Sequence, residues 1–320
     1  MFEQAKLFID ALSNVLPIIF LLLIGVFLRR INFIRPETVA DIKKLIVNLT
    51  LPAVLFGAFS GVDLELRYLA VSGSVFVMCL LVLLLGRLIG PAVGITSPYF
   101  PLLLSGFEAG MLGYAIFGAV YGQESIFRFG IVDLGQVLFV FFIMVPLLER
   151  FESGARPFRA TVQGFFKTPV IIAILGGILF SQLGLTESVR STSLGNSLFE
   201  TVALLGALTT PLVALAIGYE LQLRSGGQRK PVLTVGIRLA IWITLGLVLN
   251  LFLIGRLLDL ETGFQPAVMT MFVLPPPFVM PLFMNRASDD ERNYVLNTLT
   301  LATVVALFAF AIVSMAYPPS

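Results

Sequence analysis

Most of this sequence consists of long apolar stretches, each about as long as a helix that crosses a lipid bilayer. A transmembrane helix needs about 20 apolar residues, and only helices and closed barrels satisfy their own backbone groups inside a bilayer. The stretches therefore predict an all-α polytopic membrane protein with ten transmembrane helices. They lie at residues 11–28, 39–59, 68–88, 99–121, 127–149, 168–185, 198–219, 236–255, 264–285 and 293–316.

The composition agrees with this fold class and argues against several others. Charged residues make up only 12% of the 320 residues, whereas soluble domains carry about 25%, so a soluble enzyme and a disordered chain are excluded. The mean hydropathy of +0.97 is also too high for a β-barrel porin, whose strands alternate between apolar and polar residues.

Residue types that carry catalysis and metal binding are scarce. The sequence has no histidine and a single cysteine, Cys79, so it lacks the ligands of His-bound metals and thiolate clusters and has no disulfide framework. It also lacks the Gly-x-x-x-x-Gly-Lys-Ser/Thr loop of ATP-driven proteins. We therefore expect that the chain is not an enzyme and has no cofactor, no bound metal and no nucleic-acid partner.

The positive charges predict the orientation of the chain in the membrane. Most of the 21 Lys and Arg residues fall in the loops after the first, third, fifth, seventh and ninth stretch, and we count Arg238 among them. Loops rich in Lys and Arg face the cytoplasm. The sequence thus predicts a multi-pass protein of the inner cell membrane, with both termini non-cytoplasmic and with no cation in the centre of any span.

Two halves of five stretches each share a local pattern. Thr50 and Pro52 in the second stretch have counterparts in Thr209 and Pro211 in the seventh. Because five spans is an odd number, the second half would enter the membrane from the opposite face, as in the inverted repeats of secondary transporters. The longest polar connection separates the halves, which predicts a first repeat at 1–149, a cytoplasmic linker at 150–167 and a second repeat at 168–320.

The fourth and ninth stretches contain residues that break helices near mid-membrane. Glu108 lies among glycines in the fourth, and the ninth contains Pro275, Pro276 and Pro277. Three consecutive prolines remove three backbone donors and cannot continue a helix. The freed carbonyl groups need partners that lipid does not offer. We therefore expect two discontinuous helices that cross each other, with their breaks inside the protein.

Glu108 is the residue that we expect to carry the chemistry. A charged carboxylate near the bilayer centre costs at least about 2.5–3.5 kcal/mol on insertion scales, so such residues are functional by default. Asp133, with Gln136 nearly one turn further on, is a second acid within a span. We predict that Glu108, Asp133 and Gln136 couple transport to an ion and that Glu108 changes protonation during the cycle. Each acid can instead be a neutral, hydrogen-bonded structural group.

Small and uncharged polar residues complete the predicted site. The glycines also suit close helix packing, and the Thr and Asn side chains can bond carbonyls of their own helix, so each has a structural alternative. The predicted substrate-binding set is Asn48, Thr50, Glu108, Gly110, Gly113, Thr209, Thr210, Pro275, Pro276 and Pro277.

Several short motifs of this chain are similar to those of a known family. They are Leu16-Pro17 through Gly25, Asn48-Leu49-Thr50-Leu51-Pro52, the block of Gly113, Gly122 and Ile131-Val132-Asp133, and the proline-rich ninth stretch. With these motifs the chain resembles the auxin efflux carrier family, which includes bacterial carriers and the PIN-type plant exporters. The resemblance covers essentially the whole chain.

The resemblance implies a ten-span inverted-repeat fold related to the bile-acid/sodium symporters. It also implies that broken helices 4 and 9 cross at the substrate site and that small organic anions move by alternating access. The chain departs from the PIN pattern at the fourth span, where Glu108 and Ala115 stand in place of an Asn and a Pro. Because an ionised Glu108 would repel a carboxylate, either Glu108 is protonated in part of the cycle or the substrate is not a simple anion.

These features predict a secondary active transporter of a small organic anion, coupled to protons or to the membrane potential. A sodium-coupled symporter, in which Glu108 or Asp133 ligates the ion, is the first alternative. A membrane sensor that binds its ligand without moving it is the second. The expected partners are a small organic acid, a coupling proton or sodium ion and the lipid bilayer, and the sequence leaves a homodimer open.

Overall fold

The computed structural model describes residues 2–62, 65–152, 157–222 and 227–319, with the side chains of residues 2–15, 152 and 158 excepted. All regular structure within these ranges is helical, which confirms the predicted class. Residues 153–156 of the predicted linker and 63–64 of the loop before the third stretch lie outside the described residues.

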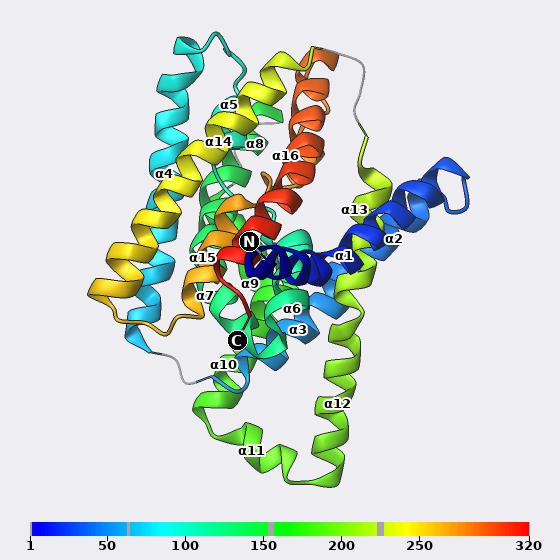
Figure 1. Ribbon diagram of the computed structural model, residues 1–320, viewed down its shortest axis with the longest axis vertical. Coiled ribbons are helices and arrows are strands. Elements are labelled where there is room, and N and C mark those ends of the chain that lie inside the picture. Colours follow the sequence, from blue (N-terminus) through cyan, green and yellow to red (C-terminus); the bar gives the residue numbers. More distant parts are fainter. Residues whose placement is uncertain (1, 63–64, 153–156, 223–226, 320) are drawn as a thin grey trace.

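The helices of the first half follow the predicted stretches closely (Figure 1). They are α1 (Phe2–Arg30), α2 (Pro36–Leu45), η1 (Ile46–Thr50), α3 (Leu51–Phe59), α4 (Leu66–Ala92), α5 (Phe100–Leu104), η2 (Ala109–Gly113), α6 (Tyr114–Tyr121), η3 (Gln123–Ser125), α7 (Ile126–Phe139), η4 (Val140–Met144) and α8 (Val145–Glu152).

The second half shows the same succession of long and interrupted helices. They are α9 (Phe158–Lys167), α10 (Pro169–Gln182), α11 (Leu185–Arg190), α12 (Ser193–Ala207), α13 (Thr209–Glu220), α14 (Arg229–Val248), η5 (Leu249–Leu257), α15 (Phe264–Val273), η6 (Met280–Phe283) and α16 (Asp289–Ala316). In both halves, some spans include a π-helical turn, such as η1 in the second span and η5 in the eighth.

Seven helices of the described residues are long and apolar enough to cross a membrane, and an eighth is added if α9 and α10, which meet at 64°, form one span. The chain is therefore a multi-pass membrane protein, but the predicted count of ten is not confirmed. The ninth stretch falls short because α15 has only 10 residues before the chain reaches its three prolines.

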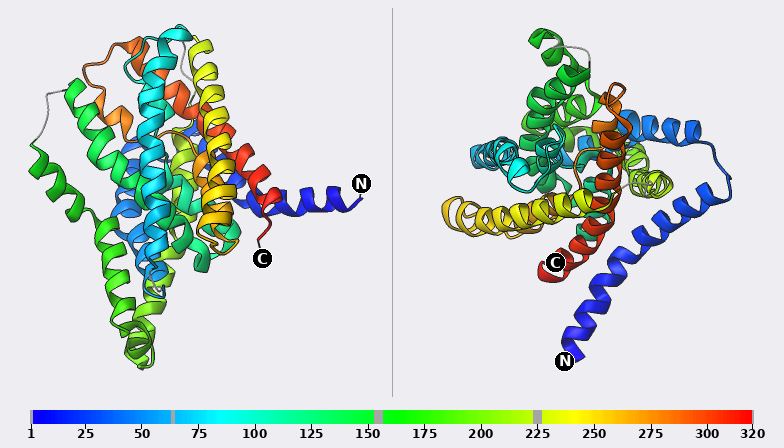
Figure 2. Two further views of the ribbon diagram at one scale, coloured as in Figure 1. Left: turned by 90° about the vertical axis from the view of Figure 1, so that its left-hand side faces the viewer. Right: turned by 90° about the horizontal axis from the view of Figure 1, so that it is seen from above.

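The helices pack as two groups. In one, α1 packs along α13, and α3 packs along α10 and α12; in the other, α4 packs on α5 and α7, and α14 packs on α15 and α16. Figure 1 shows α4 and α14 on one side of the molecule and α12 and α13 on the other, and both views in Figure 2 show α1 at the periphery. Helices α6 and α13 are in contact where the two groups meet.

Two glycines let helices of the first group approach with their backbones in contact. A Cβ added to Gly25 in α1 would collide with the carbonyl oxygen of Leu215 and the amide nitrogen of Tyr219 in α13. A Cβ added to Gly177 in α10 would lie 2.9 Å from the carbonyl oxygen of Phe56 and 3.1 Å from the amide nitrogen of Ser60 in α3. Small residues at such crossings are typical of packed membrane helices.

Candidate functional site

The fourth span is interrupted between α5 and η2. Helix α5 ends at Leu104, Ser105 is extended with φ −103° and ψ 154°, and Gly106 has φ +72°. This left-handed conformation disfavours any residue with a Cβ, which explains the glycine at this position. A new helical segment then begins at Ala109, directly after Glu108.

The ninth span is interrupted after α15. Leu274 leaves the helix with φ −63° and ψ 153°, and the three prolines at 275–277 follow in buried positions. Because proline has no N–H and disfavours a helical conformation in the residue before it, the helix cannot extend past Leu274. Both predicted breaks are thus present, at the predicted residues.

The two breaks are bonded to each other through Glu108. Its backbone N–H donates to the carbonyl oxygen of Pro275 at 2.9 Å. Its side chain accepts hydrogen bonds from two backbone N–H groups, with Met111 N at 3.1 Å from Oε1 and Phe278 N at 2.6 Å from Oε2. Glu108 is 9% exposed. The carboxylate therefore bridges one backbone donor from each broken segment.

Such a pair of backbone donors is a binding geometry for an anion. Met111 lies in the first turn after the break, where N–H groups have no partner within their own helix and the helix dipole favours negative charge. Helix starts and irregular turns with convergent N–H groups bind carboxylates and phosphates in many proteins. Here the protein's own Glu108 holds that position.

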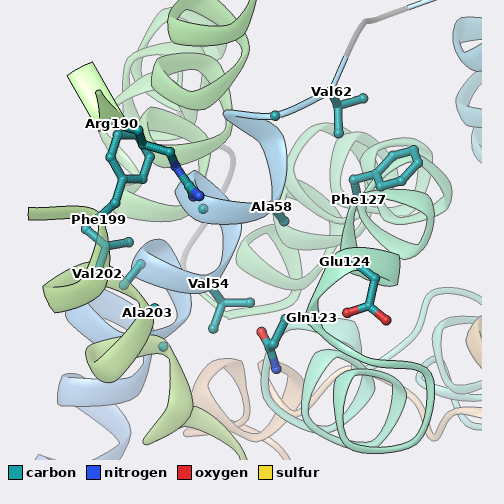
Figure 3. Close-up of a pocket in the computed structure, with 14 residues that line it drawn as sticks. Val54, Ala58, Val62, Gln123, Glu124, Phe127, Arg190, Phe199, Val202 and Ala203 are labelled. Atoms are coloured by element: carbon teal, nitrogen blue, oxygen red, sulfur yellow. The ribbon is translucent and has the colours of Figure 1, made fainter. Parts of the chain in front are cut away.

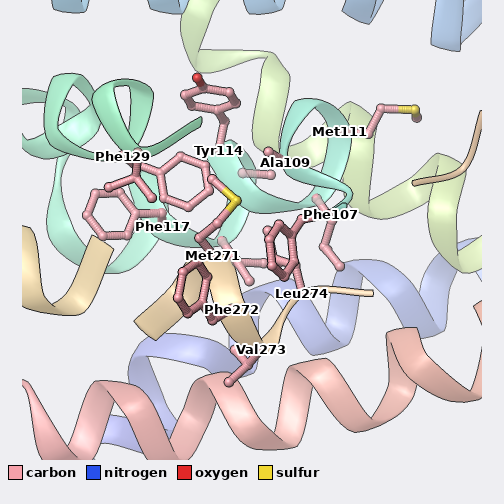
Figure 4. Close-up of a cluster of buried hydrophobic side chains, with 14 of the residues drawn as sticks. Phe107, Ala109, Met111, Tyr114, Phe117, Phe129, Met271, Phe272, Val273 and Leu274 are labelled. Carbon is pink, nitrogen blue, oxygen red and sulfur yellow. The ribbon is translucent and has the colours of Figure 1, made fainter. Parts of the chain in front are cut away.

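Large apolar side chains surround the breaks. The Phe107 and Phe272 rings stack with their centroids 5.4 Å apart, and the Trp242 ring lies 4.5 Å from Phe107. Figure 4 shows side chains of both broken segments, Phe107 and Phe272 among them, in one buried cluster. A cluster of this kind keeps water away, which strengthens the hydrogen bonds of Glu108.

Asp133 and Gln136 form a second buried polar group beside the first break. Asp133 accepts hydrogen bonds from the Tyr114 hydroxyl at 2.9 Å and from the Gln136 amide nitrogen at 3.0 Å. The Gln136 amide oxygen in turn accepts from the backbone N–H of Phe107 at 3.4 Å. The structure thus links Asp133, through Gln136, to the residue that precedes Glu108.

Arg238 lies inside the protein at the level of the two breaks, so the prediction that no cation lies in the centre of any span is wrong. It belongs to α14 rather than to the loop before that helix, and it is 2% exposed. Its guanidinium donates to four carbonyl oxygens at both breaks, which belong to Leu103, Leu104, Gly106 and Leu274. The apolar residues on both sides of Arg238, from Pro231 onward, are the signal that would have placed it within a span.

The structure brings some of the predicted uncharged polar residues to the break and not others. Thr50 and Thr209 are buried, in segments that pack against η2 and its continuation, and their hydroxyl oxygens have no hydrogen-bond partner among the described residues. Thr210 donates to the carbonyl oxygen of Ala115 at 3.3 Å. Asn48 is exposed, and its amide donates to Lys44 of its own helix at 2.8 Å.

The two predicted glycines have different surroundings. A Cβ added to Gly110 would meet its nearest atoms, Leu51 Cδ2 and Glu108 Oε1, only at 3.9 and 4.0 Å. A Cβ added to Gly113 would lie 2.6 Å from Phe129 Cζ and 2.8 Å from Leu274 Cδ1. Gly113 is thus needed for packing, whereas a Cβ at Gly110 would make only ordinary van der Waals contacts beside the Glu108 carboxylate.

Gly113→Ala is therefore expected to destabilise the protein, and Gly110→Ala is not. Overpacking a filled interior costs about 1–3 kcal/mol, because the rigid Phe129 ring must move. Thermal unfolding of the purified variants in detergent measures the difference. Equal unfolding temperatures for Gly113→Ala and Gly110→Ala would contradict the tight packing of Gly113.

Two cavities lie at opposite ends of the second and seventh spans. The first, about 470 Å³, is lined by Phe278 next to the break and by charged residues that include Arg29, Lys43 and Glu220. Lys43 and Glu220 form an ion pair at 2.9 Å. The second cavity, about 380 Å³, has Arg190 and Phe199 on one wall and Glu124 and Phe127 on the opposite one (Figure 3). Both volumes suit a small ligand.

The sequence has recognisable relatives. Residues 10–164 match the model of a family described as membrane transport protein. The match covers slightly less than half of the chain, which is thus similar to this family in its first half. The resemblance to the auxin efflux carriers is thereby confirmed, and membrane transport is the activity that it supports.

Two archaeal proteins are similar along most of the chain. An uncharacterized transporter of Methanothermobacter thermautotrophicus is 24% identical over 232 residues, which cover 68% of this chain and 70% of the relative. An uncharacterized transporter of Methanocaldococcus jannaschii is 20% identical over 305 residues, which cover 93% of this chain and 96% of the relative. Both names agree with a transporter rather than an enzyme.

Proposed function

We propose that the chain is a secondary active transporter that moves a small organic anion by alternating access. The observation that carries this proposal is the Glu108 carboxylate, held by the N–H groups of Met111 and Phe278 where the two broken segments meet. The two N–H groups that hold the Glu108 carboxylate can hold a substrate carboxylate instead when Glu108 no longer occupies them. The two archaeal relatives that are named transporters agree with this proposal.

A ten-span fold made of two inverted repeats, 1–149 and 168–320, is part of the proposal. The contacts of Gly25 and Gly177 support it, because Leu215 and Tyr219 follow Phe56 and Ser60 by 159 residues, the interval that also separates Thr50 from Thr209. The first helix of each repeat thus packs against the second span of the other repeat: α1 packs along α13, and α10 packs along α3. With the predicted orientation, both termini lie on the non-cytoplasmic side of the inner membrane.

The cavities support alternating access. They lie at opposite ends of the second and seventh spans, and Glu108 lies between those ends, beside η1 and α13. The cavity that contains Arg29 and Lys43 is at the end that the positive charges assign to the cytoplasm. In each half of the cycle, one of the two cavities would connect to the anion site.

Glu108 is the group that we propose to bind and release the coupling proton. When ionised it occupies both N–H donors, and when protonated it is a weaker acceptor that a substrate carboxylate can displace. Asp133 and Gln136, linked to the same break, are the second candidates for coupling. The hydroxyls of Thr50 and Thr209 would donate to the bound substrate.

Uptake by proteoliposomes tests the proposal. Purified protein is reconstituted, and labelled mono- and dicarboxylates are offered with and without an inward proton gradient, in sodium and in sodium-free buffer. We expect accumulation of at least one organic anion that depends on the proton gradient. Binding of an anion without any flux would instead favour a membrane sensor, and strict dependence on sodium would favour a sodium symporter.

Thr50→Val and Thr209→Val are expected to keep the protein stable and to weaken substrate binding. Valine has nearly the shape of threonine, and no hydrogen bond among the described residues is lost. If each hydroxyl donates to a substrate carboxylate, each change should lower the affinity about tenfold, or by roughly 1.4 kcal/mol. Thr298→Val is the control, because its hydroxyl already bonds Tyr294 at 2.7 Å. Unchanged affinity in both variants would remove Thr50 and Thr209 from the site.

A further inference from the structure

The carbonyl ends of both broken segments converge on Arg238. Helix α5 contributes Leu103 and Leu104, at 3.0 and 2.7 Å from one terminal nitrogen of the guanidinium. Gly106, within the first break, lies at 2.6 Å from the other terminal nitrogen, which also bonds Leu274 at 3.0 Å. Two separate helix ends are thus bound by one side chain.

The four carbonyl oxygens create a strongly negative electrostatic potential at this position. The last carbonyl groups of a helix have no partner within the helix and carry the negative end of its dipole. Here the ends of α5 and α15 point at the same place, and the Gly106 carbonyl adds a further oxygen. Backbone carbonyls of unwound membrane helices and half-helix ends are the ligands that sodium ions use in transporters.

The guanidinium fills this position without a carboxylate partner. None of the ion pairs found in the described part of the chain includes Arg238. The five N–H donors of an arginine are matched by five hydrogen bonds to the four carbonyl oxygens. The Phe107 ring, whose centroid lies 4.8 Å from the guanidinium carbon, adds a cation–π contact.

We infer that Arg238 is a resident cation that takes the place of a coupling metal ion at the carbonyl ends of the two broken helices. Its positive charge is permanently present, so this position needs no sodium. It positions the breaks, and through them the N–H groups of Met111 and Phe278, but does not touch the substrate. The consequence for coupling rests on the proposed function, whereas the identity of the cation site does not.

The test measures stability, which requires no transport. Arg238→Ala removes the charge and leaves the carbonyl oxygens exposed to a cavity. Purified wild type and variant are unfolded thermally in choline chloride, in sodium chloride, and in choline chloride with millimolar guanidinium. We expect the wild type to be indifferent to the cation. We expect the variant to unfold several degrees lower in choline and to recover in sodium or guanidinium.

Three further variants separate a missing charge from a missing contact. Arg238→Lys keeps a cation and should show no response to sodium, whereas the neutral Arg238→Gln should show it. Trp242→Phe removes the indole donor to Leu104, at 2.7 Å, without changing the charge and should show no response. Arg256→Ala, which removes an exposed arginine near Phe252, controls for the loss of any positive charge.

Two results would overturn the inference. One is stabilisation of the wild type by sodium over choline, which places a metal site elsewhere. The other is an Arg238→Ala or Arg238→Gln protein that is folded and unresponsive to every cation. If neither neutral variant accumulates in membranes while Arg238→Lys does, the requirement for a resident cation is supported. Failure of the wild type to transport any anion would refute the proposed function and leave these stability results unaffected.

Discussion

Replacing Pro275, Pro276 and Pro277 together by alanine is expected to abolish transport and leave a protein that folds and inserts. Alanine favours a continuous helix, whereas each proline removes a donor and prevents it. In a continuous helix the N–H of Phe278 would bond the carbonyl oxygen of Leu274. That bond would withdraw the donor that now holds Glu108 and compete with Arg238 for the same oxygen.

Uptake of the substrate by proteoliposomes measures this effect, and we expect it to fall to the level of empty vesicles. Gel filtration and thermal unfolding show whether the triple variant is folded. Pro169→Ala is the control, because Pro169 lies at the first position of α10, where a proline fits a helix and no break follows. Retained uptake in the triple variant would mean that the prolines are only a tolerated kink and that the anion site lies elsewhere.

The breaks could be predicted from the sequence because their cause is local. A run of three prolines stops a helix whatever surrounds it, and Gly106 supplies the left-handed turn before Glu108. The burial of Glu108 followed from its position in an apolar stretch. The hydrogen-bond partners of Glu108 could not be predicted in the same way. Met111 and Phe278 bind it through their backbone N–H groups, which almost every residue type carries.

Arg238 was missed because a rule about loops was applied to a residue within a helix. The positive-inside rule counts charges near span ends, and Arg238 lies close enough to Arg229 and Lys230 to be counted with them. Its burial depends on carbonyl oxygens that come from two distant segments, at Leu104 and Leu274. Such a partner set exists only after the chain has folded.

The second span gives another case in which the sequence alone could not identify the residues that face the site. Asn48 and Thr50 both precede Pro52, and the sequence offers no reason to separate them. Two residues apart on a helix, however, side chains point in nearly opposite directions. The structure places Thr50 inside the protein and Asn48 on its exposed face, with its amide bonded to Lys44. The turn η1 at this point is π-helical, and the sequence offers no sign of that irregularity.

Glu108→Gln is expected to keep substrate binding and remove its dependence on pH over the range from about pH 5 to 8. The amide oxygen of glutamine can take the place of one carboxylate oxygen, but the amide nitrogen at the place of the other is a donor and cannot accept a hydrogen bond. One of the two N–H groups, of Met111 or Phe278, would therefore be permanently free for a substrate carboxylate. Because glutamine cannot bind and release a proton, proton-driven transport of the substrate against its concentration gradient should fail.

Other titratable groups face the elements around Glu108, so the pH profile needs controls. Lys43 and Glu220 line the cavity that contains Phe278, and Asp133 adjoins the break through Gln136. Binding of the labelled substrate across the pH range, measured for Glu108→Gln, Asp133→Asn and Glu220→Gln, assigns the profile to one group. We expect only Glu108→Gln to flatten it. If Glu108→Gln keeps the profile of the wild type and Asp133→Asn loses it, Asp133 carries the coupling proton and Glu108 is a structural ligand of the two breaks.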